Sequence, residues 1–125
     1  MVAIAKKIQF LLVPNLLGYC GFFIMLSLVF YAAVYGDFLK EGSILTQMPW
    51  GLVSLVDIYL GLILFSSWVI WREENKRNAI IWALSILALG NMISCLYVLK
   101  AAYDSDGHII TFWLGKEKSG NKNVL

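Results

Sequence analysis

Charged residues, histidine, cysteine and proline are all scarce in this chain of 125 residues. Only 14% of the residues are charged, whereas 60% are hydrophobic. A soluble domain usually has about half apolar and about a quarter charged residues. A soluble fold of this size could not hide so much apolar surface, because small domains keep proportionally more of their surface exposed. The composition therefore favours a membrane protein.

The shortage of metal-binding and basic residues excludes several classes of function. One histidine, His108, and two cysteines, Cys20 and Cys95, offer no spacing that suits zinc, and a bis-histidine haem site cannot form within one chain. No nucleotide-binding glycine loop, nucleophile elbow or kinase motif is present. The net charge is only +2 and there is no basic run, so nucleic acid is not an expected partner. We expect no metal and no cofactor, and a non-enzymatic role fits better than an enzymatic one.

Long hydrophobic runs are what the sequence has in abundance. A bilayer core of about 30 Å needs about 20 apolar residues per helix, and three stretches meet this requirement. They predict helices over residues 11–35, 50–71 and 78–101, followed by an extramembrane tail over residues 102–125 with a short apolar segment at the interface. The prediction is an all-α integral membrane bundle of about three transmembrane helices, forming a single membrane domain over residues 1–125.

Lysine and arginine near the helix ends predict the orientation of this bundle, because cytoplasmic loops carry an excess of both. Lys6, Lys7 and the segment 72–77 lie on one predicted side, whereas Lys40 and Lys100 lie on the other. We therefore expect a multi-pass protein with a cytoplasmic N-terminus and a C-terminus on the opposite side.

Asp57 is the most informative polar residue, since a carboxylate inside a membrane helix is costly unless it is neutral, paired or hydrated. If the second and third helices form a hairpin, Asp57 is level with Asn91, and Ser54 is level with Ser94. Each helix then presents its two polar residues on one face, because residues three apart are neighbours on a helix. We expect these faces to meet, with Asp57 and Asn91 within hydrogen-bond reach.

Small residues extend these faces, and small residues let membrane helices pack closely. The predicted packing positions are Gly18, Gly21, Ser54, Gly61, Gly90 and Ser94. The polar pair between the helices is either structural or part of a binding site. On the second interpretation, the candidate binding residues are Asp57, Asn91, Tyr59, Trp68 and Glu73.

Polar, aromatic and small residues recur in a fixed order along the second and third predicted helices: Pro49, Trp50, Asp57, Ile58, Tyr59, Gly61, Trp68, Glu73, Trp82, Gly90, Asn91, Tyr97, Val98 and Leu99. This pattern resembles the domain-of-unknown-function family DUF1475. The resemblance covers residues 50–114, while the first helix is similar only in its hydrophobicity. It implies a small multi-helix membrane protein and no particular reaction.

Three hypotheses for the function remain open. The first is a non-enzymatic accessory or scaffold subunit that packs against other membrane proteins or against itself, with membrane lipid around it. The second is a membrane-embedded binding site or enzyme for a lipid-like molecule, an isoprenoid or a quinone, that uses Asp57. The third is a transporter or channel built by oligomerisation.

Overall fold

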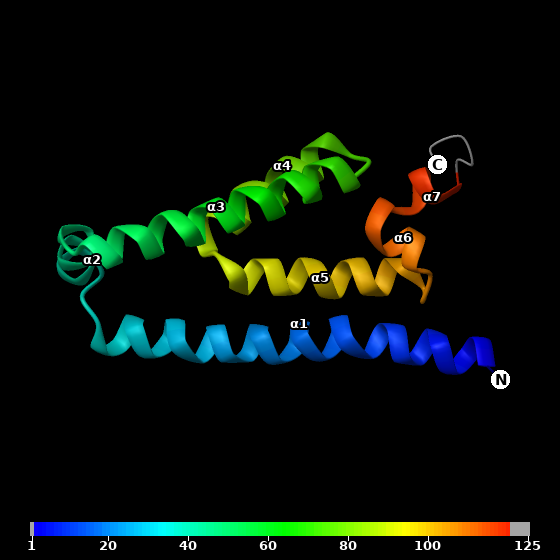
Figure 1. Cartoon of the computed structure of the whole chain (residues 1–125), viewed down its shortest axis with the longest axis horizontal. Coiled ribbons are helices and arrows are strands. Elements are labelled where there is room, and N and C mark those ends of the chain that lie inside the picture. The colour runs from blue at the N-terminus through cyan, green and yellow to red at the C-terminus, as the bar shows by residue number, and fades with distance from the viewer. Residues whose placement is uncertain (1, 121–125) are drawn as a thin grey trace.

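A computed structural model describes residues 2–120, and all regular structure in that range is helical, as the sequence predicts. Within residues 2–120, seven helices follow one another (Figure 1). Their bounds are α1 Val2–Tyr35, α2 Phe38–Gln47, α3 Pro49–Arg72, α4 Lys76–Leu89, α5 Asn91–Ser105, α6 Ile109–Leu114 and α7 Lys116–Gly120.

Helices α1 and α3 are long and apolar enough to cross a membrane. With 34 and 24 residues, they measure about 51 and about 36 Å at about 1.5 Å per residue, against a hydrocarbon core of about 30 Å. They run in opposite directions and are joined through α2 (Figure 1). Helix α1 begins at Val2, nine residues before the predicted position, because Pro14 is accommodated within the helix.

Helix α2 is a short connection whose start and end follow from local chemistry. The side chain of Asp37 accepts a hydrogen bond from the backbone N–H of Lys40 at 3.1 Å and so caps its first turn. Pro49 then opens α3 at a position where the missing N–H costs nothing. Helix α2 packs against the beginning of α3, where Gly51 is buried beside Leu45 of α2.

The third predicted transmembrane helix is broken in two at Gly90. This residue has φ +71° and ψ −149°, a backbone conformation that is essentially restricted to glycine. The chain therefore turns back, and the ring of Trp82 in α4 lies 5.2 Å from the ring of Tyr97 in α5. With 14 and 15 residues, the two helices measure about 21 and about 22 Å. Neither is long enough to cross the hydrocarbon core, so three transmembrane helices are not confirmed.

Helix α5 packs along α1 in the antiparallel direction. A Cβ atom at Gly18 would lie 2.6 Å from the Leu99 side chain, and one at Gly21 would lie 2.7 Å from the Cys95 sulfur. These two glycines, one helical turn apart, thus allow the backbones to approach closely. Both cysteines are free. They lie at similar levels along the bundle, because α5 runs back toward the N-terminal end of α1 and the Cys95 sulfur lies beside Gly21, the residue after Cys20.

The same reversal corrects the predicted position of the C-terminal segment. Lys7 donates a hydrogen bond to Asp106 at 2.8 Å, and the rings of Phe10 and Phe112 are 5.7 Å apart. Helices α6 and α7 therefore lie at the end of the bundle where α1 begins (Figure 1). The prediction that the two termini lie on opposite sides is wrong for the described residues, because α4 and α5 fold back where a single crossing helix was expected. Residues 121–125 of the predicted tail lie outside the described range.

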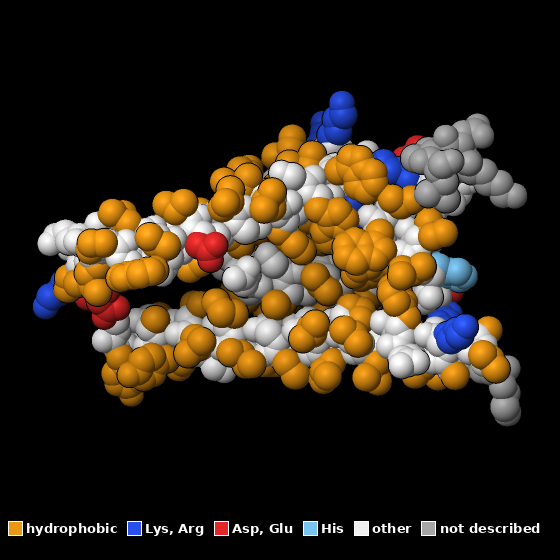
Figure 2. Space-filling model, viewed as in Figure 1, with side chains coloured by type: hydrophobic (Ala, Val, Ile, Leu, Met, Phe, Trp, Pro, Cys, Tyr) orange, Lys and Arg blue, Asp and Glu red, His pale blue; other side chains and the backbone are white. Residues whose placement is uncertain are grey.

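The buried core lies where α3, α4, α5 and α6 meet, around Val69, Ile86 and Tyr97, none of which is exposed. Most of the surface of α1 is uncovered, and only 6% of its most apolar stretch is buried within the chain. Figure 2 shows hydrophobic side chains spread over both long helices. Such a surface is what a helix presents to lipid or to a neighbouring membrane protein.

Candidate functional site

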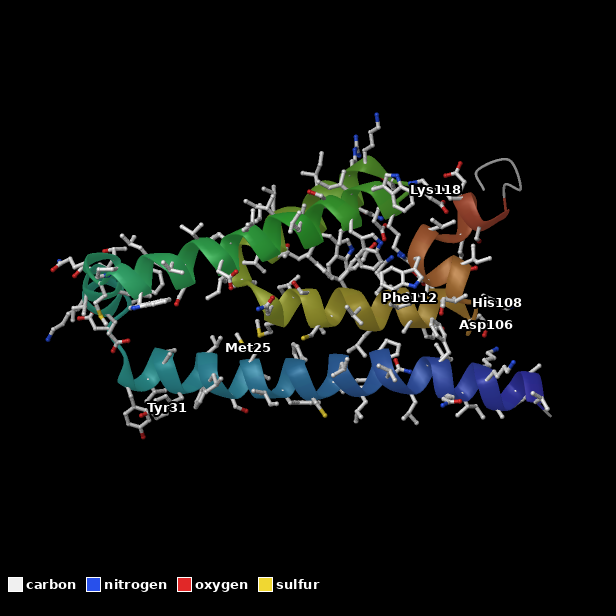
Figure 3. The ribbon with its side chains drawn as sticks, in the orientation of Figure 1. Met25, Tyr31, Asp106, His108, Phe112 and Lys118 are labelled. Carbon is white, nitrogen blue, oxygen red and sulfur yellow. The ribbon has the colours of Figure 1, made fainter. Side chains whose placement is uncertain are left out.

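Polar and aromatic side chains converge at the end of the bundle where α3 ends, α4 begins and α5 ends. We call this region the polar end; it contains the α3–α4 turn, the last turns of α5, and helices α6 and α7. Figure 3 shows Phe112 and Lys118 there, with Asp106 and His108 close to the start of α1. The α3–α4 turn is fixed by Asn75, whose side chain accepts a hydrogen bond from the Arg77 N–H at 3.0 Å and caps α4.

Arg72, in the last turn of α3, is the central residue of this end. Its side chain is only 3% exposed. The Nε atom donates a hydrogen bond to the Phe112 carbonyl at 2.7 Å, and Nη1 donates one to the Tyr97 hydroxyl at 3.1 Å. Its Nη2 atom has no acceptor among the described residues. A buried donor without a partner costs about 1–3 kcal/mol.

Glu73 is held by two donors at once. Its Oε1 atom accepts hydrogen bonds from the Tyr97 hydroxyl at 2.7 Å and from Lys100 Nζ at 2.9 Å. Burial raises the pKa of this carboxyl, but those two hydrogen bonds and the charges of Lys100 and Arg72 outweigh burial and leave the pKa below its ordinary value. Lys100 also donates to Asp104 at 3.0 Å. Glu73 is therefore an ionised link between the α3–α4 turn and α5.

Aromatic rings surround this polar group. The rings of Trp68 and Tyr97 are 5.7 Å apart and perpendicular, and the indole N–H of Trp68 donates to the Trp113 carbonyl at 3.2 Å. Phe112 completes the contact between α3 and α6, 6.2 Å from Trp68. An edge-to-face pair such as Trp68 and Tyr97 adds about 0.5–1.5 kcal/mol beyond the area that it buries. The rings thus limit the access of water to Arg72.

A cavity of about 200 Å³ opens beside these residues, between the α3–α4 turn, α5 and the start of α7. Its lining includes the interacting residues Arg72, Glu73 and Lys100. It also includes Glu74 and Lys116, neither of which forms an ion pair with another residue of the range 2–120. No cluster of metal-ligating side chains occurs in the same range.

Two of the five predicted binding residues, Trp68 and Glu73, lie at the polar end. The other three do not: Asp57, Tyr59 and Asn91 are all exposed on the outside of the bundle. The predicted hydrogen bond between Asp57 and Asn91 is absent from residues 2–120 as described. The prediction fails because it assumed a continuous hairpin partner for α3, whereas the break at Gly90 directs α5 away from α3 and toward α1.

The predicted packing positions separate in the same way. Gly18, Gly21 and Ser94 lie at helix contacts inside the bundle. Ser54 and Gly61 are exposed on α3 together with Asp57, and a Cβ at Gly61 would have open space around it. Because positions 54, 57 and 61 share one helix face, they form a stripe with no packing partner within the described residues.

Arg72, Tyr97 and Lys100 were not predicted as members of the site. Arg72 was assigned to the segment 72–77 on one predicted side of the membrane, and Lys100 was assigned to the opposite side. One available signal was the i, i+4 spacing of Lys100 and Asp104, which favours an ion pair on one helix face. Their meeting with Glu73 depends on the reversal at Gly90, which spacing alone does not indicate.

The fold and the polar end define an all-helical protein with two helices that could cross a membrane and a shorter helical pair folded between them. A family model, protein of unknown function (DUF1475), matches residues 6–108. The chain belongs to this family, and the match includes α1 from residue 6 onward as well as all the residues that carried the resemblance; it ends at residue 108, before the predicted limit at residue 114. No curated protein and no solved structure matches the chain.

Proposed function

We propose that this chain is an integral membrane subunit without catalytic activity of its own, which packs against another membrane protein through α3. The observation that carries the proposal is Asp57. It lies in an apolar helix that is long enough to span a membrane, it is exposed, and it has no hydrogen-bond partner among the described residues. A carboxylate in this position is costly in lipid, so a neighbouring protein that offers a donor would stabilise it.

The distribution of charge supports a membrane placement with the polar end in the cytoplasm. Within the described range, the basic residues at the polar end and at the start of α1 beside it are Lys6, Lys7, Arg72, Lys76, Arg77, Lys100, Lys116 and Lys118. Of the lysines and arginines in residues 2–120, only Lys40 lies at the opposite end. Because cytoplasmic segments are rich in lysine and arginine, both ends of the described chain face the cytoplasm, and the α4–α5 pair enters the bilayer from that side and returns to it.

The Ser54–Gly61 face supports a helix as the neighbour of Asp57. Gly61 lies one turn beyond Asp57 and would allow a second backbone to approach closely. Hydrogen bonds between membrane helices contribute about 0.6–2 kcal/mol. Because this energy is too small to hold two helices together, the interface also needs the apolar surface around Asp57.

Photo-crosslinking in native membranes tests this proposal. A photoreactive amino acid at Gly61 should give a protein adduct of defined mass, whereas the same amino acid at Ile63, which is 50% exposed on the other side of α3, should not. Asp57→Leu should reduce the adduct about threefold or more, and Asp57→Asn should reduce it less because the amide still forms hydrogen bonds. Equal lipid adducts from both positions, with no protein adduct, would contradict the proposal. An adduct of twice the chain mass would identify a second copy and favour self-association, the arrangement that an oligomeric transporter or channel requires.

A second candidate function, binding of an isoprenoid-like or quinone-like molecule, has one observation in its favour. Tyr59 lines an apolar groove of about 760 Å³ between α2 and α3, together with Leu45 and Leu55. Asp57 does not belong to this groove, because residues two apart lie about 200° apart around a helix. Extraction with mild detergent followed by lipid mass spectrometry tests this function: a bound molecule should be lost in Tyr59→Ala and kept in Asp57→Asn.

A further inference from the structure

The cavity at the polar end has a composition that none of the functions above uses. Its lining carries three basic side chains, those of Arg72, Lys100 and Lys116, and three acidic ones, those of Glu73, Glu74 and Asp104. Equal numbers of opposite charges in a small space complement a ligand that carries both signs. With a volume of about 200 Å³, the cavity is smaller than sites for drug-sized molecules, which occupy about 300–1,000 Å³.

Most of these charges already interact with one another. Lys100 bonds to Glu73 and Asp104, and Arg72 lies 3.5 Å from Glu73. One cation and one anion remain for a ligand. Lys116 forms no ion pair within the described range, and Glu74 accepts only the backbone N–H of Glu117, at 2.7 Å. Arg72 adds a positive charge in the wall of the cavity; its Nη2 group has no acceptor in the same range and is covered by neighbouring atoms, so Arg72 acts on a ligand through its charge.

The start of α4 adds positive potential to the same cavity. Asn75 caps this helix and lines the cavity together with Asn78. The N-terminus of a helix favours anions, because its first N–H groups and the helix dipole point outward there. Lys116, the buried Arg72 and the N-terminus of α4 thus form a subsite for an anion. Glu74 offers a subsite for a cation within the same cavity.

We propose that this cavity binds a phosphoethanolamine group, as carried by the headgroup of phosphatidylethanolamine. The phosphate lies between Lys116, Arg72 and the start of α4, and the ammonium lies against Glu74. The lipid assignment rests on the membrane placement proposed above, which puts the polar end at the membrane–water interface and brings a headgroup to the height of the cavity. Recognition of the charged group itself depends only on the cavity.

Two substitutions separate the two subsites without breaking the interactions that hold the polar end together. Lys116→Gln removes the uncommitted cation, and Glu74→Gln removes the negative charge but keeps an oxygen that can accept the Glu117 N–H. Lys76→Gln is the matched control, since it removes a charge from the same end of the molecule at a position that does not line the cavity. General attraction to an anionic surface would decrease equally in Lys116→Gln and in Lys76→Gln.

The first experiment is native mass spectrometry of the full chain from nanodiscs with equal amounts of phosphatidylethanolamine and phosphatidylglycerol. We expect retained phosphatidylethanolamine to exceed phosphatidylglycerol, and Lys116→Gln to reduce retention of both lipids about tenfold. Glu74→Gln should abolish the preference between them, and Lys76→Gln should leave it intact. Equal retention of the two lipids by the unaltered chain, or equal losses in Lys116→Gln and Lys76→Gln, would overturn the proposal.

The second experiment titrates water-soluble phosphoethanolamine into the detergent-solubilised chain, with inorganic phosphate and ethanolamine as comparison probes. Tighter binding of phosphoethanolamine than of either comparison probe supports recognition of both charges, whatever the outcome of the crosslinking at Gly61. Binding of the soluble probe together with no preference in nanodiscs would overturn the lipid assignment and indicate a soluble ligand. Equal binding of phosphoethanolamine and inorganic phosphate would overturn the role of Glu74.

Discussion

Replacement of Gly90 by alanine tests the feature on which the whole arrangement depends. In the native backbone conformation at this position, a residue with a side chain costs about 1–3 kcal/mol. A Cβ atom there would meet nothing within 4 Å, so this cost comes from the backbone alone. Alanine also favours a continuous helix over glycine by about 0.8–1.0 kcal/mol. Together these terms shift the balance between the folded-back pair and a straight helix by about 2–4 kcal/mol, or about thirty- to nine-hundred-fold.

A straight helix in place of the α4–α5 pair would be long enough to cross the membrane. A helix over residues 76–105 would measure about 45 Å, more than the hydrocarbon core, and would carry the C-terminal end across the membrane. Labelling with a membrane-impermeant thiol reagent in oriented vesicles reports this change, in a background where both native cysteines are serine. Val2→Cys and Gly120→Cys should react from the same side in the unaltered fold. With Gly90→Ala, a measurable fraction of Gly120→Cys should react from the opposite side, and the thermal midpoint in detergent should fall.

Gly61→Ala is the control for the Gly90 prediction. Gly61 also has open space around its Cβ position, but it lies in a regular helix, where alanine is neutral or favourable. If Gly90→Ala matched Gly61→Ala in stability and left the labelling of Gly120→Cys unchanged, the reasoning about the break at Gly90 would be refuted.

The remaining predictions concern the contact between α1 and α5 and the polar end. Gly18→Ala should lower the free energy of unfolding by about 1–3 kcal/mol, because its Cβ would overlap Leu99; Leu99→Ala should restore part of the loss in the double variant, and Gly42→Ala should have no such effect, since open space surrounds Gly42. A coupling energy near zero in this double-mutant cycle would contradict the contact. Glu73 stabilises the fold while it is ionised, and its pKa is lowered on folding, so its contribution is present above its ordinary pKa of 4.5 and is lost as the pH falls through the lower folded value. Thermal unfolding between about pH 7 and about pH 3 should show this loss in the native chain and a weaker dependence in Glu73→Gln; identical profiles would show that the Lys100 and Tyr97 contacts contribute nothing.

Composition and hydrophobic runs predicted the fold class and two of the long helices, because both depend on local sequence. Helix α3 is observed within one residue of its predicted bounds at each end, since Pro49 and the polar turn after Arg72 are strong boundary signals. The third long run was also apolar and also bounded by polar turns. Only one residue, Gly90, distinguishes a crossing helix from a folded-back pair, and glycine is common inside membrane helices.

The candidate site was predictable only in part, and for the same reason. Trp68 and Glu73 were identified because they belong to α3 and the turn that follows it, whose placement was correct. Tyr97 and Lys100 reach them from α5, and the direction of α5 follows from a tertiary reversal. The identification of Asp57 as an unusual residue stands on local sequence, whereas its predicted partner depended on a register that the fold does not have.

The shortness of the α4–α5 pair gives the molecule a wedge-like outline. At the polar end, segments of α1, α3, α4 and α5 lie side by side with α6 and α7, whereas of residues 2–120 only parts of α1, α2 and α3 lie at the opposite end (Figure 1). In a bilayer, such a molecule displaces more lipid from the leaflet that holds the wide end than from the other. The strain is smallest where the leaflet that holds the wide end is the convex leaflet of a curved membrane. Membrane curvature alone would therefore concentrate the molecule at such places.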